Sequence, residues 1–488
     1  MSELLERFIG HENEERTAVR DDAGSTSYRT VVARARAIAG ALAEEGSSLA
    51  GERVALLIHP GAEFVAAFFG VLLAGGCVVV LSPLHPAPET RYFCTDAGIR
   101  TVLVSAPHLA LAAPLADLAT VQPVETFSGA PTSFAMSDDD AALQLYTSGT
   151  TGKPKGAVLT HRNLGVQQRV LGDAWGFGAG DTLLHALPLH HMHGLCIALM
   201  TALGAGATVR MRTFDAIKLW DEMADVTTFM AVPAMYHRLF VAYDAESQEI
   251  QARWAANAKQ LRLATSGSAA LPTTLGERWR ALTGNIPLER FGMTEIGVGL
   301  TNALTGARFP GLVGLPPDTV ETRIVDDAGS DAETGELLVR GPSVFGRYHE
   351  RPEETATAFT VDGWFHTGDT VVREKDLPGA PFRILGRTSV DILKSGGYKL
   401  SALEIEEVLR DHAAVGEVAV IGIADEAWGD RVVACIVKKH DCTGTELRAF
   451  AKERLAGYKV PKDFVFLDDL PKNALGKVLK PELKRRFA

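Results

Sequence analysis

The chain has 488 residues, too many for one ordinary hydrophobic core, so two or more domains are expected. Hydrophobic residues make up 46% and charged residues 22% of the sequence, proportions typical of soluble globular proteins. The net charge of −11 argues against broad electrostatic binding to nucleic acid or to acidic membranes.

Cysteine usage and the first residues bear on the compartment. The five cysteines are Cys77, Cys94, Cys196, Cys435 and Cys442. No C-x-x-C pair occurs, so we expect neither a disulfide framework nor a zinc site, and a reducing, cytoplasmic location fits. The first residues, MSELLERFIGHENEER, carry too many charges for a signal peptide.

Early in the chain, residues 64–81 form an unbroken apolar run at the lower limit of a membrane span. The run contains the pair Gly75-Gly76, followed by the β-branched segment CVVVL. A helix that ends at the glycine pair and continues into a buried strand explains it better than a membrane helix. We therefore expect no stable membrane insertion.

Strand-like and helix-like runs alternate along the first 290 residues. The strand-like runs are RVALLIH (53–59), CVVVL (77–81), TVLVS (101–105), GAVLT (156–160), TLLHALP (182–188), ATVRM (207–211), TTFMAV (227–232) and LRLATS (261–266). Helical stretches lie between several of them, for example at 89–97. This alternation predicts an α/β fold with parallel sheets covered by helices, arranged as two similar lobes.

The loop YTSGTTGKPKG (146–156) is too rich in glycine for a helix or strand. Its hydroxyl residues are Thr147, Ser148, Thr150 and Thr151, and its cations are Lys153 and Lys155. Glycines allow close backbone approach, and hydroxyls, N–H groups and cations suit a polyphosphate. It is not a Walker loop, because G-x-x-x-x-G-K-[ST] does not occur. From composition alone, a polar surface loop is an equal alternative.

The pattern changes after Thr294. Residues 297–385 are rich in Gly, Pro and short β runs, which predicts a smaller β subdomain. Beyond Val390, helix signals at 401–411 and 445–456 alternate with strand-like runs.

The last part of the chain is long enough for an independent α+β domain. We place the boundary near GRTSVD (386–391). The expected organisation is a large domain at 1–386, a hinge at 387–390 and a small domain at 391–488.

Six stretches together resemble the adenylate-forming family of acyl-CoA synthetases, peptide-synthetase adenylation domains and luciferases. They are YTSGTTGKPKG (146–156), SGSAAL (266–271), RFGMTE (290–295), GWFHTGD (363–369), GRTSVDILKSGGYKL (386–400) and PKNALGK (471–477). They follow the family order and span essentially the whole chain. The resemblance implies an α/β enzyme with a mobile C-terminal domain that uses ATP, Mg²⁺ and often coenzyme A.

The resemblance assigns an ATP site. Glu295 matches the carboxylate that holds Mg²⁺, and Thr294 matches a phosphate contact. Asp369 matches the ribose-binding aspartate, and Arg387 a second ribose or phosphate contact. The other matching nucleotide-site positions are Thr147, Ser148, Thr150, Thr151, Lys155, Ser268, Ala269, Ala270, Phe291 and Gly292.

Lys477 matches the lysine that the small domain brings to the carboxylate and α-phosphate, where its charge stabilises acyl-adenylate formation. Rotation of the small domain would then admit the thiol. The loop that would line the pantetheine tunnel contains Lys394, Ser395, Gly396 and Gly397. The hinge position usually occupied by Asp or Lys is Ser389 here, so its contacts stay open.

Two segments, PLHHMHGL (188–195) and VPAMYHRL (232–239), match the walls of the acyl pocket. They and LKSGGYK are similar to malonyl-CoA synthetases. His191 matches a residue beside the thiol channel, and Met293 an acyl contact. Arg238 matches the arginine thought to hold a second carboxylate. A buried arginine would need such a partner, although a surface ion pair is the alternative.

The expected reaction joins a short dicarboxylic acid, malonate or methylmalonate, to CoA through an acyl-adenylate. Alternatives are a ligase for short-chain, fatty or aryl monocarboxylates, an enzyme that loads a carrier protein, or a non-catalytic ATP-binding protein. A lysine acetyltransferase that acts on Lys399 or Lys477 is a further possible partner. The histidine cluster at 190–193 lacks a matching carboxylate or cysteine, so we expect no metal there.

Overall fold

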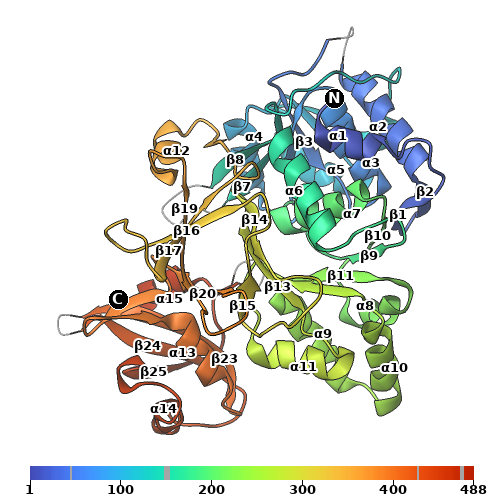
Figure 1. The fold of residues 1–488 in the computed structure, drawn as a ribbon. Coiled ribbons are helices and arrows are strands. Elements are labelled where there is room, and N and C mark those ends of the chain that lie inside the picture. Colours follow the sequence, from blue (N-terminus) through green and yellow to red (C-terminus); the bar gives the residue numbers. More distant parts are fainter. Residues whose placement is uncertain (44–46, 148–153, 426–427, 473–476, 488) are drawn as a thin grey trace.

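A computed structural model describes residues 1–43, 47–147, 154–425, 428–472 and 477–487 (Figure 1). Two α/β lobes, a β-sheet unit and a C-terminal unit make up the fold. Within these residues, no helix is long and apolar enough to cross a membrane.

The first lobe is built on a seven-stranded sheet with the order β18-β8-β7-β4-β3-β5-β6. Its strands are β3 (Arg53–Leu57), β4 (Cys77–Val80), β5 (Thr101–Val104), β6 (Thr120–Pro123), β7 (Ala141–Thr147), β8 (Lys155–Thr160) and β18 (Arg347–Tyr348). Strands β7, β4, β3, β5 and β6 are parallel, and β8 and β18 continue the sheet antiparallel.

The apolar run at 64–81 belongs to this lobe, and its predicted structure is confirmed. It forms α3 (Ala62–Leu73) and then β4. Gly75 between them has a φ of +88°, a conformation that favours glycine and ends the helix. Residues of α3 pack on α2 (Tyr28–Leu42), and both contribute to the main hydrophobic core.

The second lobe has an eight-stranded sheet with the order β14-β13-β12-β11-β9-β10-β1-β2. Its strands are β1 (Thr17–Asp21), β2 (Gly24–Ser27), β9 (Thr182–His185), β10 (Thr208–Met211), β11 (Thr228–Ala231), β12 (Leu263–Ser266), β13 (Leu288–Met293) and β14 (Gly297–Thr301). The six inner strands are parallel, and the edge strands β2 and β14 are antiparallel. The prediction of two parallel-sheet lobes is therefore confirmed.

Helices complete the large domain. They include α1 (Glu3–Ile9), α4 (Ala87–Asp96), α6 (His161–Ala174), α8 (Ala216–Glu222), α9 (Pro233–Ala245), α10 (Gln248–Lys259), α11 (Thr273–Thr283) and α12 (Pro352–Ala358). Helix α6 begins with a capping box in which Thr160 and Asn163 satisfy each other's backbone N–H groups. Residues 193–200 form a π-helical segment, a geometry that is frequent at functional sites.

The β subdomain is a five-stranded antiparallel sheet with the order β15-β20-β19-β17-β16. Its strands are β15 (Leu312–Gly314), β16 (Glu321–Val325), β17 (Thr334–Arg340), β19 (Phe365–Arg373) and β20 (Phe382–Arg387). The predicted segment 297–385 does not stay together entirely. Its first strand, β14, joins the second lobe, and β18 joins the first, so this segment ties both lobes to the subdomain.

The C-terminal unit has a mixed sheet with the order β22-β21-β24-β23, and β25 adds to β24 in parallel. Its elements are β21 (Ile392–Ser395), β22 (Tyr398–Ser401), α13 (Ala402–Arg410), β23 (Val415–Asp425), β24 (Gly429–Lys438), α14 (Gly444–Lys452), β25 (Asp463–Leu467) and α15 (Lys480–Phe487). It has hydrophobic clusters of its own on the two sides of this sheet.

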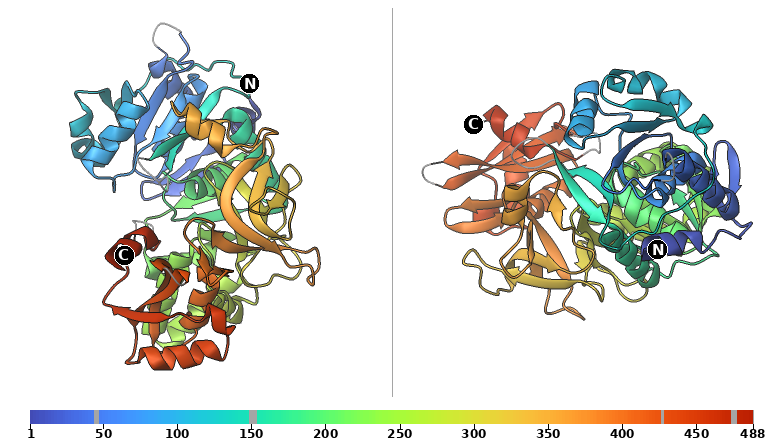
Figure 2. Two further views of the ribbon diagram at one scale, coloured as in Figure 1. Left: turned by 90° about the vertical axis from the view of Figure 1, so that its left-hand side faces the viewer. Right: turned by 90° about the horizontal axis from the view of Figure 1, so that it is seen from above.

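The C-terminal unit lies against the β subdomain and the second lobe, away from the first lobe (Figure 2). Ser401 Oγ donates a hydrogen bond to the carbonyl of Leu385 at 2.6 Å, and the backbone N–H of Thr273 donates to Glu407 at 2.6 Å. Polar contacts of this kind are typical of interfaces between domains that move relative to each other.

Candidate active site

Five predicted site residues from distant parts of the chain come together beside the β subdomain. Arg387 and Lys155 act electrostatically on Glu295, and Arg387 and Lys477 act on Asp369. Such coupling requires proximity, because charge–charge interactions weaken with distance and are screened by solvent. The structure therefore brings the carboxylates and cations expected at a nucleotide site into one region.

Asp369 and Arg387 are direct neighbours on the antiparallel strands β19 and β20. The Arg387 Nε lies 3.1 Å from Asp369 Oδ1, and its Nη1 donates to the Thr367 carbonyl at 2.9 Å. Asp369 is only 5% exposed. Burial raises its pKa to about 6, although Arg387 and Lys477 act in the opposite direction.

The second oxygen of Asp369, Oδ2, is buried and has no hydrogen-bond partner within the described residues. An unsatisfied buried carboxylate oxygen is costly, so it indicates a missing donor. The two hydroxyls of a ribose are donors of that kind, and this carboxylate fits them.

Glu295 is held in place before any ligand binds. Its carboxylate is 5% exposed, and the Tyr348 hydroxyl donates to Oε1 at 2.9 Å. The Glu295 carbonyl accepts a hydrogen bond from the Phe345 N–H at 2.7 Å. Burial raises the pKa of Glu295, while the Tyr348 hydrogen bond opposes the rise. Tyr348 uses one of the lone pairs, so the carboxylate retains acceptor sites for a hard cation such as Mg²⁺.

Lys155 completes this part of the site. Its ammonium lies 5.1 Å from the centre of the Tyr348 ring, a cation–π distance. Thr147 and Lys155 are register partners at the ends of β7 and β8, so the polyphosphate loop predicted between them begins and ends here. Ser148, Thr150, Thr151 and Lys153 lie outside the described residues.

One of the residues predicted to form the adenine slot, Ser268, adopts a strained backbone. Ser268 has a φ of +71°, which is uncommon for a residue with a side chain. Ala269 and Ala270 follow it in an exposed stretch between β12 and α11. Phe291 is half-buried on β13. At Gly292 a Cβ would lie 2.0 Å from the carbonyl oxygen of Gly297, so no larger residue fits there. Met293 and Thr294 follow at the end of this strand.

Lys477 reaches this site from the C-terminal unit. Its side chain keeps exposed surface, yet partial desolvation and the positive charge of Arg387 lower its pKa, while Asp391 and Asp369 oppose this effect. The cation predicted to act on the acyl-adenylate thus lies beside the ribose-site carboxylate.

Three histidines beside the predicted acyl pocket are neutral at pH 7. The His190 ring centre lies 4.2 Å from that of His191 and 5.3 Å from that of His85. Burial lowers the pKa of His190 to about 3 and that of His191 to about 4. Across the part of the chain that the structure describes, no group of three or more His, Cys, Asp or Glu side chains is arranged to hold a metal.

Arg290 is a site residue that the sequence analysis missed. It is 4% exposed, and its Nε and Nη2 have no hydrogen-bond partner among the described residues. Burial alone lowers its pKa to about 10. The guanidinium presses against Gly267, where a Cβ would lie 2.5 Å from Arg290 Cζ. The signal in the sequence was the charged pair Glu289-Arg290 inside a strand-like run, since both residues fall in the buried half of β13.

Further polar atoms near Arg290 also lack partners. His193 interacts electrostatically with Arg290, and its Nδ1 lies 3.3 Å from Ser268 Oγ, while its Nε2 is buried and unpaired within the described chain. Thr265 Oγ1 and Ser266 Oγ, at the end of β12, are unpaired by the same criterion. A buried cation next to unpaired polar groups is the arrangement expected where an anionic ligand, rather than a protein group, supplies the partner.

Arg238, the residue predicted to hold a second carboxylate, lies on the solvent-facing side of α9. Its side chain is exposed, and its guanidinium sits 4.3 Å from the centre of the Phe214 ring. Its predicted contact with a second carboxylate stays a prediction.

The predicted pantetheine loop is the tight turn between β21 and β22. Gly396 and Gly397 have φ values of +57° and +84°, while Ser395 is buried and Lys394 is exposed. The neighbouring Lys399 Nζ lies 2.7 Å from Asp327 Oδ1, between β16 and β17. In this arrangement the turn therefore packs on the β subdomain.

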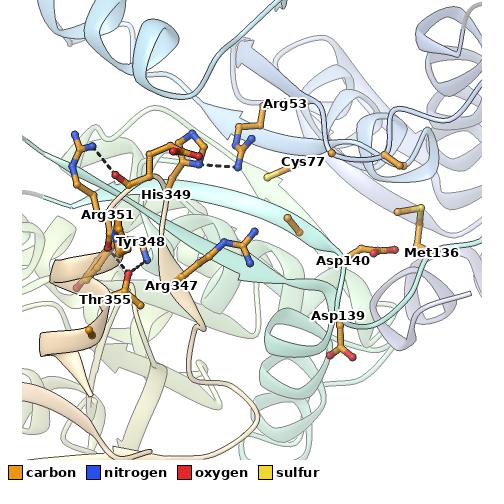
Figure 3. Close-up of a pocket in the computed structure, with 17 residues that line it drawn as sticks. Arg53, Cys77, Met136, Asp139, Asp140, Arg347, Tyr348, His349, Arg351 and Thr355 are labelled. Atoms are coloured by element: carbon orange, nitrogen blue, oxygen red, sulfur yellow. Dashed lines mark hydrogen bonds between the residues drawn. The ribbon is translucent and has the colours of Figure 1, made fainter. Parts of the chain in front are cut away.

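A separate surface pocket of about 900 Å³ lies between the first lobe and residues 347–356 (Figure 3). Arg53 donates to His349 on one wall, as Figure 3 shows. Arg351, on another wall, pairs at 3.0 Å with Asp96, which does not line the pocket. None of the predicted site residues that the structure describes lines this pocket. Its wall includes Tyr348, so the pocket lies behind the residue that supports Glu295.

Comparisons with known proteins agree with this geometry. The model of the AMP-binding enzyme family matches residues 6–349, and that of the AMP-binding enzyme C-terminal domain matches residues 404–477. The mitochondrial malonate–CoA ligase ACSF3 of Mus musculus is 39% identical, covering 97% of this chain and 89% of that protein.

Two crystal structures of MatB from Rhodopseudomonas palustris cover 100% of this chain and 99% of MatB, at 33% identity. The TM-score is 0.90 for the ATP-bound structure and 0.81 for the apo structure. The structure as a whole is thus more similar to the ATP-bound one.

Proposed function

Because the chain belongs to the AMP-binding enzyme family, we propose that it is an AMP-forming acid–thiol ligase for malonate or methylmalonate. The reaction would convert the acid, ATP and CoA into acyl-CoA, AMP and pyrophosphate through an acyl-adenylate. Support for the acid comes from the malonate–CoA ligase to which the chain is similar over 97% of its length.

The observation that carries the choice of acid is the buried guanidinium of Arg290, whose Nε and Nη2 have no hydrogen-bond partner in the described part of the chain. Among short acids, a dicarboxylate brings a second negative charge that offsets the cost of burying this cation. Two guanidinium nitrogens without partners can bind one carboxylate in a bidentate manner. A fatty or aryl monocarboxylate would leave Arg290 unpaired, so these alternatives are less favoured.

The remaining residues have the following proposed tasks. Asp369 accepts hydrogen bonds from the ribose, while Lys155 and the polyphosphate loop bind the phosphates. Glu295 would hold Mg²⁺, which supplies charge neutralisation on the triphosphate. Lys477 stabilises the negative charge that develops as the acid's carboxylate attacks the α-phosphorus and pyrophosphate leaves. Neutral His191 can lie beside the incoming thiol.

The second step requires a thiol at the acyl carbon, with AMP as the leaving group. We propose CoA as the acceptor, with the 394–397 turn lining its tunnel after the domain 391–488 rotates about 387–390. A carrier-protein phosphopantetheine is the alternative acceptor. A lysine acetyltransferase is a further proposed partner, because acetylation of Lys477 would remove the charge that adenylation needs.

The cytoplasm stays the proposed location. The scattered, reduced cysteines support it, whereas the mouse relative is named a mitochondrial protein.

The decisive experiment is a pyrophosphate-release screen over acetate, propionate, benzoate, malonate, methylmalonate and succinate, with and without CoA. Malonate or methylmalonate is expected to give the highest kcat/KM. A monocarboxylate that is clearly preferred would reject the assignment of the acid. Absence of acid-dependent pyrophosphate release with every compound would reject the enzyme class.

A matched pair of variants then tests which of the two arginines, Arg290 or Arg238, binds the second carboxylate. Arg290→Met should lower kcat/KM for malonate by about 10²-fold or more, the loss expected for a buried charge pair. Arg238→Met removes an exposed guanidinium from the same region of the fold. If Arg238→Met alone abolishes malonate selectivity, the second carboxylate binds at Arg238 instead.

A further inference from the structure

Three ionic side chains form a buried cluster just beyond Lys477. The Lys480 Nζ lies 2.5 Å from Asp391 Oδ1 and 2.6 Å from Glu406 Oε1. The side chains of Lys480 and Glu406 are 9% and 7% exposed, and that of Asp391 is 13% exposed. The cluster joins three parts of the C-terminal unit. They are the first turn of α15, the segment directly after the proposed hinge, and helix α13.

Each carboxylate of this cluster has a second fixed contact. Glu406 Oε1 accepts the Val420 N–H of β23 at 2.7 Å. Asp391 Oδ2 accepts the Arg387 N–H at 3.0 Å. Gly386 leaves room for this approach, because a Cβ there would lie 2.4 Å from the Cβ of Asp391. The position of Lys480 is therefore determined by groups that are themselves held.

Stability alone does not explain the cluster. Burying three charges costs desolvation, and apolar replacements of such clusters are often equally or more stable. Burial acts to lower the pKa of Lys480, but Glu406 and Asp391 outweigh it, and the pKa is raised, so Lys480 stays charged. Instead, the cluster fixes the position of the segment that begins α15.

The location of the cluster indicates why a fixed position of this segment would matter. Lys480 lies three residues after Lys477, and Asp391 is the first residue after the proposed hinge. Asp391 bonds to the backbone of Arg387, whose side chain pairs with Asp369. Bonded groups therefore lead from the segment of Lys477, through the hinge, to the ribose-site carboxylate.

We propose that Lys480 is a positioning residue, which ties the segment of Lys477 to Asp391 so that the small domain delivers Lys477 to the acyl-adenylate in a fixed position. The proposal rests on the function proposed above. Lys480, Glu406 and Asp391 all follow residue 390, so the cluster turns with the small domain. The Asp391–Arg387 bond crosses the hinge and belongs to the arrangement in which Lys477 is close to Asp369.

The two half-reactions provide the test. Adenylation is measured as acid-dependent pyrophosphate release without CoA. Thioester formation is measured in a single turnover, by adding CoA after acyl-adenylate has accumulated on the enzyme. Lys480→Met removes the charge at similar length. It should lower kcat for adenylation by about 10- to 100-fold, as misplacement of a catalytic group by about 1 Å does. KM for ATP should change less than about 3-fold, because ATP does not touch Lys480.

Thioester formation by Lys480→Met should stay within about 3-fold of wild type, since Lys477 serves the first step only. Lys480→Arg should restore part of the adenylation rate. Lys472→Met is the matched control. Lys472 lies in the same segment as Lys477 and also pairs with two carboxylates, Glu417 at 2.7 Å and Asp469 at 3.4 Å. These pairs lie at the surface. It should leave both half-reactions unchanged.

Asp391→Asn gives a second variant of the same shape. Its single amide oxygen can keep the bond from the Arg387 N–H, so the change weakens the Lys480 contact. Lys480→Met combined with Asp391→Asn should slow adenylation no more than Lys480→Met alone, since Lys480→Met already removes the contact that Asp391→Asn weakens. Equal losses in both half-reactions together with a lowered Tm would show a purely structural role and overturn the proposal, as would an unchanged adenylation rate. If wild type adenylates a different acid, the function proposal fails for malonate, but Lys480 is tested with that acid.

Discussion

The Arg387 guanidinium holds one oxygen of the buried Asp369 carboxylate at 3.1 Å, and the other oxygen has no hydrogen-bond partner among the residues that the structure describes. Arg387 is bound to the Thr367 carbonyl as well, so the pair is oriented by the β19–β20 ladder. A half-satisfied, pre-oriented carboxylate loses little freedom when a ligand binds, and this kind of preorganisation favours affinity.

Replacing Asp369 with Asn keeps the shape but removes the charge. Charge-assisted hydrogen bonds contribute about 1.5–3 kcal/mol, so KM for ATP should rise by about 10- to 150-fold. KM for the acid should change little. Steady-state kinetics with ATP varied at saturating malonate measures the effect. Glu321→Gln, which removes an exposed carboxylate from the same sheet, is the control and should behave like wild type.

The pKa of Asp369 predicts how ATP affinity depends on pH. Burial raises this pKa to about 6, so the carboxylate is ionised above pH 6 and protonated below it. Ribose binding needs the ionised form, and ATP affinity should therefore fall as the pH decreases through about 6. Isothermal titration of ATP between pH 5 and 8 gives the curve. Asp369→Asn should lack this transition, and a curve shared by both proteins would assign it to another group.

Arg290 is expected to lower the stability of the protein while it supports malonate binding. Its guanidinium is buried, and two of its nitrogens have no partner within the described residues. Because this destabilises the ligand-free protein, Arg290→Met should unfold at a higher temperature than wild type. Relief of buried charge is worth on the order of 1–4 kcal/mol. Malonate should raise the Tm of wild type and leave that of Arg290→Met unchanged. A lower Tm for the variant without ligand would show that Arg290 is satisfied and would remove the argument for a second carboxylate.

The order of elements was predictable from the sequence, because it depends on local signals. The run at 64–81 shows this, since a glycine pair separates a helix from a β-branched strand. Five residues identified by motif, Lys155, Glu295, Asp369, Arg387 and Lys477, lie in one region. Their roles stay predictions, and the loop at 148–153 lies outside the described residues.

Contacts between distant segments were not predictable in this way. Burial of Arg290 depends on its contact with Gly267 on the neighbouring segment, and exposure of Arg238 depends on which face of α9 packs inward. The cluster around Lys480 joins positions 391, 406 and 480. No local sequence pattern identifies charged residues that meet only after the sheet of the C-terminal unit has formed.

Tyr348 predicts an effect on the metal rather than on the acid. Its hydroxyl donates to Glu295 Oε1, and its ring lies beneath the Lys155 ammonium. Tyr348→Phe keeps the ring, and therefore the cation–π contact, but removes the donor. A hydrogen bond to a charged group contributes about 1.5–3 kcal/mol. Glu295 would lose that support, and its pKa, already raised by burial, would rise further.

The Mg²⁺ concentration for half-maximal adenylation should consequently increase about 10-fold or more in Tyr348→Phe. The effect should be larger at pH 6 than at pH 8, because protonated Glu295 cannot bind a cation and the variant protonates at a higher pH. Titration of Mg²⁺ at fixed ATP and malonate, at both pH values, measures this. Phe345, which packs against Tyr348 with ring centres 4.7 Å apart, offers Phe345→Leu as the control that disturbs packing alone. If Phe345→Leu shifts the Mg²⁺ requirement as much as Tyr348→Phe does, packing orients Glu295, and the hydroxyl has no separate role.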